Sequence, residues 1–294
     1  MAKILKKKTI ADKITWYELD APRIARKRKP GQFVIVRPCE GGERIPLTIA
    51  DADPEKGSIT LVVQEVGKTT AYMGRELEEG GDMLDVVGPL GTATHIPDTP
   101  GRILAIAGGL GIAPLYPILK GFKEKGHEVT VILGARSSDL FIMREMTEAL
   151  VDKVLICTDD GSEGHHGLVT EVEKQLLESG EKFDEIIAIG PAIMMKFCVE
   201  TARPFQVPIT VSLNTIMIDG TGMCGGCRVQ YGGADKFVCV DGPEFDGYQV
   251  NFDRMMQRQA AYADQEKKAY HDYLCRLEAK AQQIEATEKE GAVS

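Results

Sequence analysis

The first hundred residues alternate between apolar and polar positions in short runs. ITWYEL, QFVIVRP and SITLVVQEV are examples, and glycine- or proline-containing turn signals separate them. Several short strands at such spacing are typical of an all-β barrel or sandwich. We predict a β-barrel domain over residues 1–99, with a linker of turn-forming residues at 95–101.

From Arg102 onward, apolar runs alternate with amphipathic segments. Repeated strand–helix units form a parallel sheet that carries helices on both faces. The pattern therefore predicts an α/β domain over residues 100–213. Strands are expected at 103–107, 128–133, 153–157, 185–189 and 209–213, and helices at 114–125, 140–150, 169–179 and 192–202.

The last eighty residues divide into two different segments. Residues 214–250 are rich in glycine and cysteine and have the composition of loops. Residues 251–294 are charged, and Tyr270, Tyr273 and Leu274 recur there at helical spacing. We expect a C-terminal amphipathic helix that docks in part on the protein, with a solvated tail as the alternative.

Composition and charge narrow the class of protein. A chain of 294 residues suggests about two domains, and a net charge of −9 disfavours general binding to nucleic acid or to anionic lipid. No segment reaches the roughly 20 apolar residues of a membrane span, and the N-terminus lacks the apolar core of a signal peptide. Seven cysteines, four of them scattered, do not form a disulfide framework. A reducing, cytoplasmic location is expected.

A cluster of cysteines provides the strongest chemical signal. Cys224, Cys227 and Cys239 follow the spacing C-x2-C-x11-C, and Asp219 stands five residues before the first of them. A plant-type [2Fe–2S] site has another cysteine near that position. We predict a [2Fe–2S] cluster whose fourth ligand is Asp219, and a protein that transfers single electrons.

Alternative interpretations of these residues remain open. A structural zinc site also uses CxxC pairs, but it needs four ligands, and no second CxxC or CxxH follows. Asp219 and Gly220 could form only a turn. The fourth ligand would then be Cys275, Asp241 or a residue of a partner protein.

Two groups of residues indicate nucleotide binding. Gly108, Gly109 and Gly111 lie between a predicted strand and a helix start, and Gly190 ends a later strand. Backbone amides in such turns bind phosphate, and ligands lie at the carboxyl ends of parallel strands. In the β domain, Arg44 and the segment 67–70 offer donors for a pyrophosphate, although each alone could equally be an ordinary surface loop.

Taken in order, these motifs resemble the ferredoxin–NADP reductase superfamily over about residues 1–250. The motifs are R-x-P-L-T, a G-x-T loop, GGLGIAP and a cysteine cluster closed by CVDGPEFDG. The chain is most similar to the branch of dihydroorotate dehydrogenase B electron transfer subunits. That branch has cysteine where Asp219 stands, and the aspartate points to the small subunits of NADH-dependent reduced ferredoxin:NADP oxidoreductases.

The resemblance implies FAD in the barrel, NAD(H) in the α/β domain and a [2Fe–2S] cluster. Asp219, Cys224, Cys227 and Cys239 would be the metal ligands, and no catalytic acid or base is required. The cofactor-binding positions carried over from the family are Arg44, Pro46, Leu47, Thr48, Val62, Val63, Gln64, Gly67, Thr69, Thr70, Gly108, Gly109, Gly111 and Gly190.

The resemblance also implies an oxidoreductase subunit in a heterodimer with a large flavin and Fe–S subunit. That complex would use flavin-based electron bifurcation and reach ferredoxin through the large subunit. The first alternative is the electron transfer subunit of a dihydroorotate dehydrogenase B complex. The second is a zinc-stabilised nucleotide-binding adaptor without redox activity.

Overall fold

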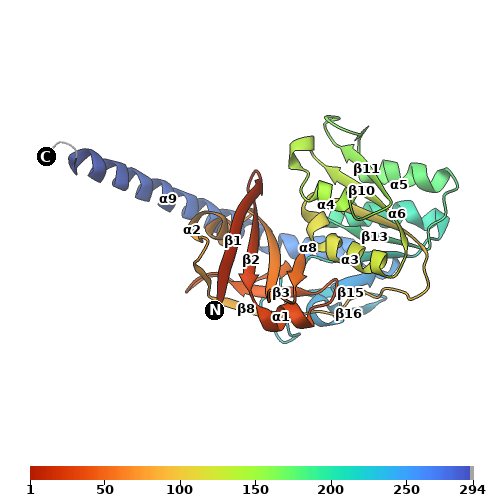
Figure 1. The fold of residues 1–294 in the computed structure, drawn as a ribbon, viewed down its shortest axis with the longest axis horizontal. Helices are drawn as coiled ribbons and strands as arrows, with labels where there is room; N and C mark the ends of the chain where they lie inside the picture. Colours follow the sequence, from red (N-terminus) through yellow and green to blue (C-terminus); the bar gives the residue numbers. More distant parts are fainter. Residues whose placement is uncertain (292–294) are drawn as a thin grey trace.

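The structure, a computed structural model, describes residues 1–291, with side chains through residue 279. Figure 1 shows a β lobe, an α/β lobe and a long C-terminal helix that extends away from both. In this described part of the chain, no helix has the length and apolar character that crossing a membrane requires. The last three residues of the predicted C-terminal extension lie outside the described residues.

The β lobe consists of a five-stranded and a three-stranded sheet around one core, as the alternating pattern predicts. The first sheet has the order β5-β6-β2-β1-β7, and the second has the order β4-β3-β8. Its elements are β1 (Ala2–Ala11), β2 (Ile14–Asp20), α1 (Pro22–Lys27), β3 (Phe33–Arg37), β4 (Ile45–Thr48), β5 (Asp51–Asp53), β6 (Ser58–Gln64), α2 (Lys68–Glu76), β7 (Asp82–Met83) and β8 (Asp85–Leu90).

The α/β lobe is built on a seven-stranded sheet with the order β12-β11-β10-β9-β13-β14-β17. All its pairings are parallel except that of β17 with β14. The predicted α/β class is therefore confirmed. The elements are β9 (Arg102–Gly108), α3 (Ile112–Glu124), β10 (Glu128–Ala135), α4 (Arg144–Glu148), β11 (Lys153–Thr158), β12 (His165–His166), α5 (Val169–Glu178), β13 (Glu185–Ile189), α6 (Ala192–Ala202) and β14 (Ile209–Ser212).

One helix is shorter than the sequence predicts. The pattern suggested a helix over residues 140–150, but α4 begins only at Arg144. Residues Ser138–Leu140 form a separate 3₁₀ turn, and Met143 has a left-handed backbone with φ of 54°. A left-handed residue cannot continue a right-handed helix, so the helix starts after it.

The cysteine-rich segment extends the α/β lobe. It contains the hairpin β15 (Arg228–Tyr231) and β16 (Ala234–Phe237), the short helix α7 (Val238–Asp241) and strand β17 (Glu244–Asp246). Strand β17 pairs with β14 at the edge of the large sheet. Val229, Val238 and Phe245 pack in one core with Phe33 and Ile35 of β3. This shared core fixes the segment against the β lobe.

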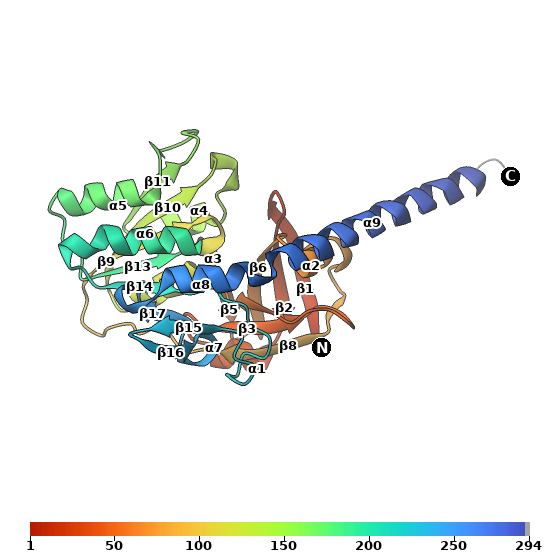
Figure 2. The same cartoon turned by 180° about the vertical axis from the view of Figure 1, so that it is seen from behind.

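The C-terminal segment is helical, as predicted, and docks in part. It comprises α8 (Phe252–Gln259) and α9 (Ala263–Gly291), which follow one another across the molecule in Figure 2. Helix α9 contacts α2, and Tyr273 and Leu274 are half-buried on this side. Beyond this contact, α9 projects away from the two lobes (Figure 1).

Candidate functional site

The structure brings the predicted metal ligands into one segment, in two pairs. Cys227 and Cys239 are buried, with 1% exposure each, and their sulfur atoms lie 3.2 Å apart as free thiols. Cys224 is exposed, and its thiol interacts with the carboxylate of Asp219. One pair is therefore internal and the other lies at the surface. Burial next to Cys227 raises the pKa of the Cys239 thiol to about 12.

Asp219 is held ionised by its neighbours. Interaction with the Cys224 thiol, together with hydrogen bonds from Thr221 and the backbone N–H of Met223, keeps the pKa of its carboxyl far below the usual range. The Thr221 hydroxyl and the Met223 N–H donate to the same oxygen, Oδ2, at 2.7 and 3.0 Å. The other oxygen, Oδ1, is shielded from solvent and has no hydrogen-bond partner among the described residues.

The loop from Asp219 to Cys227, called the cluster loop below, depends on glycine. Gly220, Gly222 and Gly225 all have positive φ, at 74°, 84° and 68°. A Cβ at Gly220 would lie 2.7 Å from Leu90 Cδ1 and 2.9 Å from Ile35 Cγ1. Glycine therefore lets the loop curl tightly and pack on strands β3 and β8.

The donor set fits a [2Fe–2S] cluster better than a single metal ion. In the described part of the chain, no group of three His, Cys, Asp or Glu side chains converges in a way that could hold one ion. A structural zinc needs four ligands around one point, whereas a [2Fe–2S] cluster spreads its four ligands over two irons. The unpartnered buried Oδ1 of Asp219 and the close thiols of Cys227 and Cys239 agree with such a divided site.

The other suggested fourth ligands are engaged elsewhere. The Asp241 carboxylate accepts hydrogen bonds from the Phe237 N–H at 2.7 Å and from Lys236 at 3.3 Å. Cys275 lies on α9, where its sulfur is 3.8 Å from the His271 ring. Neither side chain joins the described thiol pairs.

The R-x-P-L-T motif lies next to the cluster loop. Arg44 precedes β4, and its Nε donates a 2.9 Å hydrogen bond to the carbonyl oxygen of Ile218, the residue before Asp219. The strand β4 that contains Pro46, Leu47 and Thr48 is half-exposed along its whole length. An apolar strand that stays half-exposed offers a surface for a flat apolar ligand.

The G-x-T motif forms the start of α2. The Thr70 hydroxyl accepts hydrogen bonds from the N–H groups of Val66 and Gly67, at 2.9 and 3.1 Å, and so caps the helix. Thr69 is buried, and its hydroxyl donates to Glu43. The first N–H groups within α2 remain at a helix N-terminus, where an anion is favoured.

Strand β6 places its predicted residues in different surroundings. Val62 packs in a core with α3 of the α/β lobe, whereas Val63 points into the β-lobe core. Gln64 is exposed at the end of the strand. Because neighbouring side chains of a strand point to opposite faces, the two valines cannot both present side chains to one ligand.

The glycines of the α/β lobe meet at the carboxyl ends of two neighbouring strands. We call residues 108–111 and Gly190 the nucleotide turn. A Cβ at Gly111 would overlap the carbonyl oxygen of Ile189, and one at Gly190 would lie 3.2 Å from the Gly108 nitrogen. No side chain caps the N-terminus of α3 that follows. Dinucleotides bind at the carboxyl ends of the strands in such sheets, where an uncapped helix N-terminus offers backbone N–H groups to phosphate.

Comparisons with known proteins agree with these features. Residues 214–251 match the iron–sulfur cluster binding domain of dihydroorotate dehydrogenase B, and residues 105–200 match the oxidoreductase NAD-binding domain. The chain is 49% identical to a dihydroorotate dehydrogenase B (NAD(+)) electron transfer subunit homolog of Thermotoga maritima, over 92% of this chain and 95% of that protein. It is 39% identical to a probable electron transfer subunit of Methanocaldococcus jannaschii, over 77% of this chain and 82% of that protein.

The chain belongs to the family of dihydroorotate dehydrogenase B electron transfer subunits and their homologs. It is also similar to a solved chain of the NADH-dependent reduced ferredoxin-NADP oxidoreductase, a complex studied for flavin-based electron bifurcation. The TM-score is 0.88, with 48% identity over 93% of this chain and 98% of the other. The resemblance predicted from the motifs is confirmed, and this family member is an electron-transferring oxidoreductase subunit.

Sequence reasoning missed several residues at the cluster loop of this electron transfer subunit. The Ile218 carbonyl, the Thr221 hydroxyl and the Met223 N–H all form contacts there. None of them belongs to a ligand pattern. The signal that could have found Thr221 is a hydroxyl between two glycines directly after a candidate ligand.

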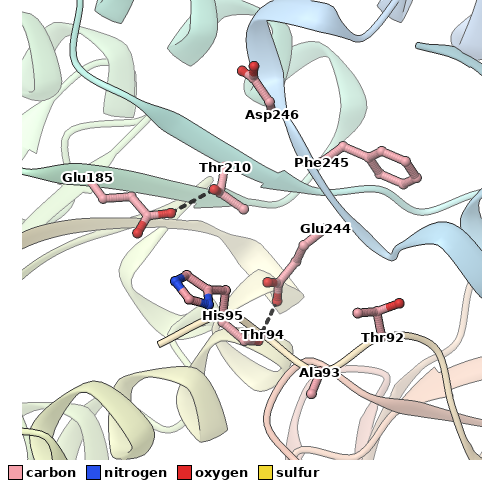
Figure 3. A pocket seen from close by; sticks show the side chains of 9 residues that line it. All are labelled: Thr92, Ala93, Thr94, His95, Glu185, Thr210, Glu244, Phe245 and Asp246. Carbon is pink, nitrogen blue, oxygen red and sulfur yellow. Dashed lines mark hydrogen bonds between the residues drawn. The ribbon is translucent and has the colours of Figure 1, made fainter. Parts of the chain in front are cut away.

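A separate cavity of about 220 Å³ lies at the amino ends of β13 and β14 (Figure 3). Glu185 and Glu244 point toward it and accept hydrogen bonds from Thr210 and Thr94, each at 2.7 Å. Burial raises the pKa of Glu244 to about 7 and also raises that of Glu185. Dinucleotides bind at the carboxyl ends of parallel strands, and this cavity lies at the opposite ends, so it is not the predicted cofactor site.

Proposed function

We propose that this chain is the NAD(H)-linked electron transfer subunit of an NADH-dependent reduced ferredoxin:NADP oxidoreductase. The observation that carries the proposal is the contact between the cluster loop and the β-lobe sheet that contains the R-x-P-L-T motif. Arg44 binds the Ile218 carbonyl, and Gly220 packs on Ile35 and Leu90. A flavin on β4 and a cluster in the loop would therefore be neighbours.

The β lobe supplies the FAD site in this proposal. Arg44, Pro46, Leu47 and Thr48 line the flavin together with β6, where Gln64 and the backbone at Val62 and Val63 make the contacts. Gly67, Thr69 and Thr70 place the N-terminus of α2 toward the pyrophosphate. Bound FAD supplies the step that joins hydride exchange with NAD(H) to transfer of single electrons.

The nucleotide turn and the cluster loop complete the path. Gly108, Gly109, Gly111 and Gly190 let the backbone approach NAD(H) closely. Asp219 and Cys224 would hold the [2Fe–2S] cluster from one side, and Cys227 and Cys239 would hold it from the other. The first pair lies at the surface and the second in the core, so electrons leave by the Asp219 side.

A large flavin and Fe–S subunit docks over this exit and forms a heterodimer. Large apolar side chains flank the ligands and are exposed, with 89% exposure for Met223, 51% for Ile218 and 44% for Val240. Apolar side chains gathered at such a point indicate a protein interface. Ferredoxin exchanges electrons with the complex through the large subunit. The complex works in the cytoplasm. In electron bifurcation, this chain is the branch that transfers electrons to NAD.

A dihydroorotate dehydrogenase B complex is the second candidate. It is favoured by relatives that bear that name, such as the Geobacillus thermodenitrificans subunit, which is 33% identical over 84% of this chain. The aspartate in the position of the first cysteine favours the ferredoxin-linked enzyme instead.

Purification of the tagged native chain from its own cells tests the proposal. We expect a large flavin and Fe–S subunit to co-purify, with flavin and two irons bound to each small chain. The complex should oxidise NADPH and reduce both NAD and oxidised ferredoxin. Activity with dihydroorotate would support the second candidate, and a colourless chain that contains zinc would support the adaptor and contradict both.

A further inference from the structure

The two oxygens of the Asp219 carboxylate have unequal surroundings. Oδ2 accepts hydrogen bonds from the Thr221 hydroxyl at 2.7 Å and from the Met223 N–H at 3.0 Å. Oδ1 is shielded from solvent and has no hydrogen-bond partner among the described residues. The Cys224 thiol also acts on this carboxylate, as described above, but only Oδ2 accepts hydrogen bonds within the loop.

Such an arrangement is unfavourable unless a ligand completes it. A shielded carboxylate oxygen without a partner is unfavourable, because its hydration is not replaced. The chain could relieve this cost by rotating the carboxylate, but the two donors to Oδ2 oppose the rotation. The unpartnered oxygen therefore marks the direction from which a positively charged ligand approaches.

The backbone on either side of Thr221 holds its hydroxyl in place. Gly220 and Gly222 have φ values of 74° and 84°, a region that other residues rarely adopt. Gly220 packs against Ile35 and Leu90 so closely that a Cβ would clash with both side chains. Gly222 packs against Val240. The Thr221 side chain is exposed, and its hydroxyl donates a hydrogen bond to Asp219.

We propose that Asp219 binds the cluster iron through Oδ1 alone, and that Thr221 is the positioning residue that enforces this mode. The inference rests on the proposed [2Fe–2S] cluster. A carboxylate can bind a metal through one oxygen or two. Because Oδ2 already accepts two hydrogen bonds, it does not bind the iron. The same hydrogen bonds draw charge away from the carboxylate and weaken it as a donor.

The consequence is a defined effect on the reduction potential. Hydrogen bonds around a cluster raise its potential, since they stabilise the more negative reduced state. Thr221→Val keeps the shape of the side chain and removes the donor. We expect this variant to have a more negative cluster potential and altered g-values in the EPR spectrum of the reduced state. Thr221→Ser keeps the donor and should resemble the wild type.

Asp219→Cys provides the matched background. A thiolate sulfur offers no second oxygen for Thr221 to hold, so adding Thr221→Val should leave the potential of that variant unchanged. The measurement is a redox titration followed by EPR, with iron content determined for all variants of the full complex. Loss of the cluster in Thr221→Val but not in the double variant would also support the positioning role.

Three results would overturn the inference. They are an unchanged potential and spectrum in Thr221→Val, an equal shift in both backgrounds, and loss of the cluster in both backgrounds. The last two would show that Thr221 acts on the loop in general and not through the carboxylate. A wild-type chain that never carries a [2Fe–2S] cluster would instead contradict the proposed function itself, which keeps the two failures distinct.

Discussion

The nucleotide turn and the cluster loop are both rich in glycine, but they use it for different reasons. At Gly111 and Gly190 the backbone of one turn touches the backbone or side chains of another, so there is no space for a Cβ. At Gly220, Gly222 and Gly225 the main requirement is a left-handed backbone. Packing between two strand ends therefore holds the nucleotide turn. The cluster loop depends instead on its backbone dihedral angles and on the proposed metal cluster.

This difference predicts how far each region depends on its cofactor. The nucleotide turn is held by close packing within the protein, so a bound nucleotide is not needed to hold its shape. The cluster loop retains a shielded carboxylate oxygen without a hydrogen-bond partner among the described residues, which a bound metal cluster would satisfy. We therefore expect a preorganised nucleotide site beside a cluster site that becomes rigid on loading.

The largest effect should come from filling the nucleotide turn. Gly111→Ala places a Cβ against the carbonyl oxygen of Ile189, and the atoms that it meets all belong to the backbone. We expect a loss of about 4 kcal/mol or more in the free energy of unfolding, because neither strand end can move. Gly225→Ala is the matched control. Its φ is 68° and its nearest neighbour, Phe237, is 3.7 Å away, so only about 1 kcal/mol should be lost. Denaturant unfolding would compare them, and equal losses would contradict the distinction.

The α/β lobe should also respond to pH in a way that the cluster loop does not. Glu173 on α5 is fully buried without a hydrogen-bond partner for either oxygen, and burial raises its pKa from 4.5 to about 8. A raised carboxyl pKa stabilises the fold below pH 4.5, and this contribution is lost as the pH rises toward 8. The loss should be on the order of 4 kcal/mol.

Glu173→Gln should remove this pH dependence of the free energy of unfolding between pH 5 and pH 8. Glu178→Gln on the same helix is the control, since that side chain is exposed and, among the described residues, pairs with Lys174 alone. The idea fails if both variants keep the slope of the wild type.

Removing the cluster should affect one region selectively. Anaerobic chelation of iron is expected to increase amide hydrogen exchange in the cluster loop about 100-fold, as a local opening that the cluster had prevented. Exchange at residues 108–111 should stay unchanged. Uniform changes across both regions, measured by mass spectrometry, would mean that the cluster supports the whole fold.

The smallest effect concerns the surface of the cluster loop. Met223→Asp places a charge on the most exposed apolar side chain beside the ligands. We expect affinity for the large subunit to fall about 10- to 100-fold, with the bound iron unchanged. Phe205→Asp, at an exposed apolar position outside the cluster loop, should leave the affinity unchanged. Equal weakening by both would place the interface elsewhere.

The sequence predicted the elements whose pattern is local. Alternation and strand–helix repeats were sufficient for both lobes, and spacing was sufficient to nominate Asp219 beside three cysteines. The pairing of β17 with β14 was not predictable, because it joins segments more than thirty residues apart. The Arg44 bond to Ile218 spans 174 residues and leaves no local pattern. Met143 delayed the start of the predicted helix through a backbone angle that methionine rarely adopts.

In the proposed function, electrons pass between NAD(H), a flavin and the [2Fe–2S] cluster within this one chain. An anaerobic titration of the purified, cofactor-loaded chain with NADH, followed by visible and EPR spectroscopy, tests it most directly. We expect bleaching of the flavin together with the EPR signal of a reduced [2Fe–2S] cluster, which weakens in Asp219→Ala. Flavin reduction without any cluster signal, at potentials where dithionite reduces the cluster, would contradict it.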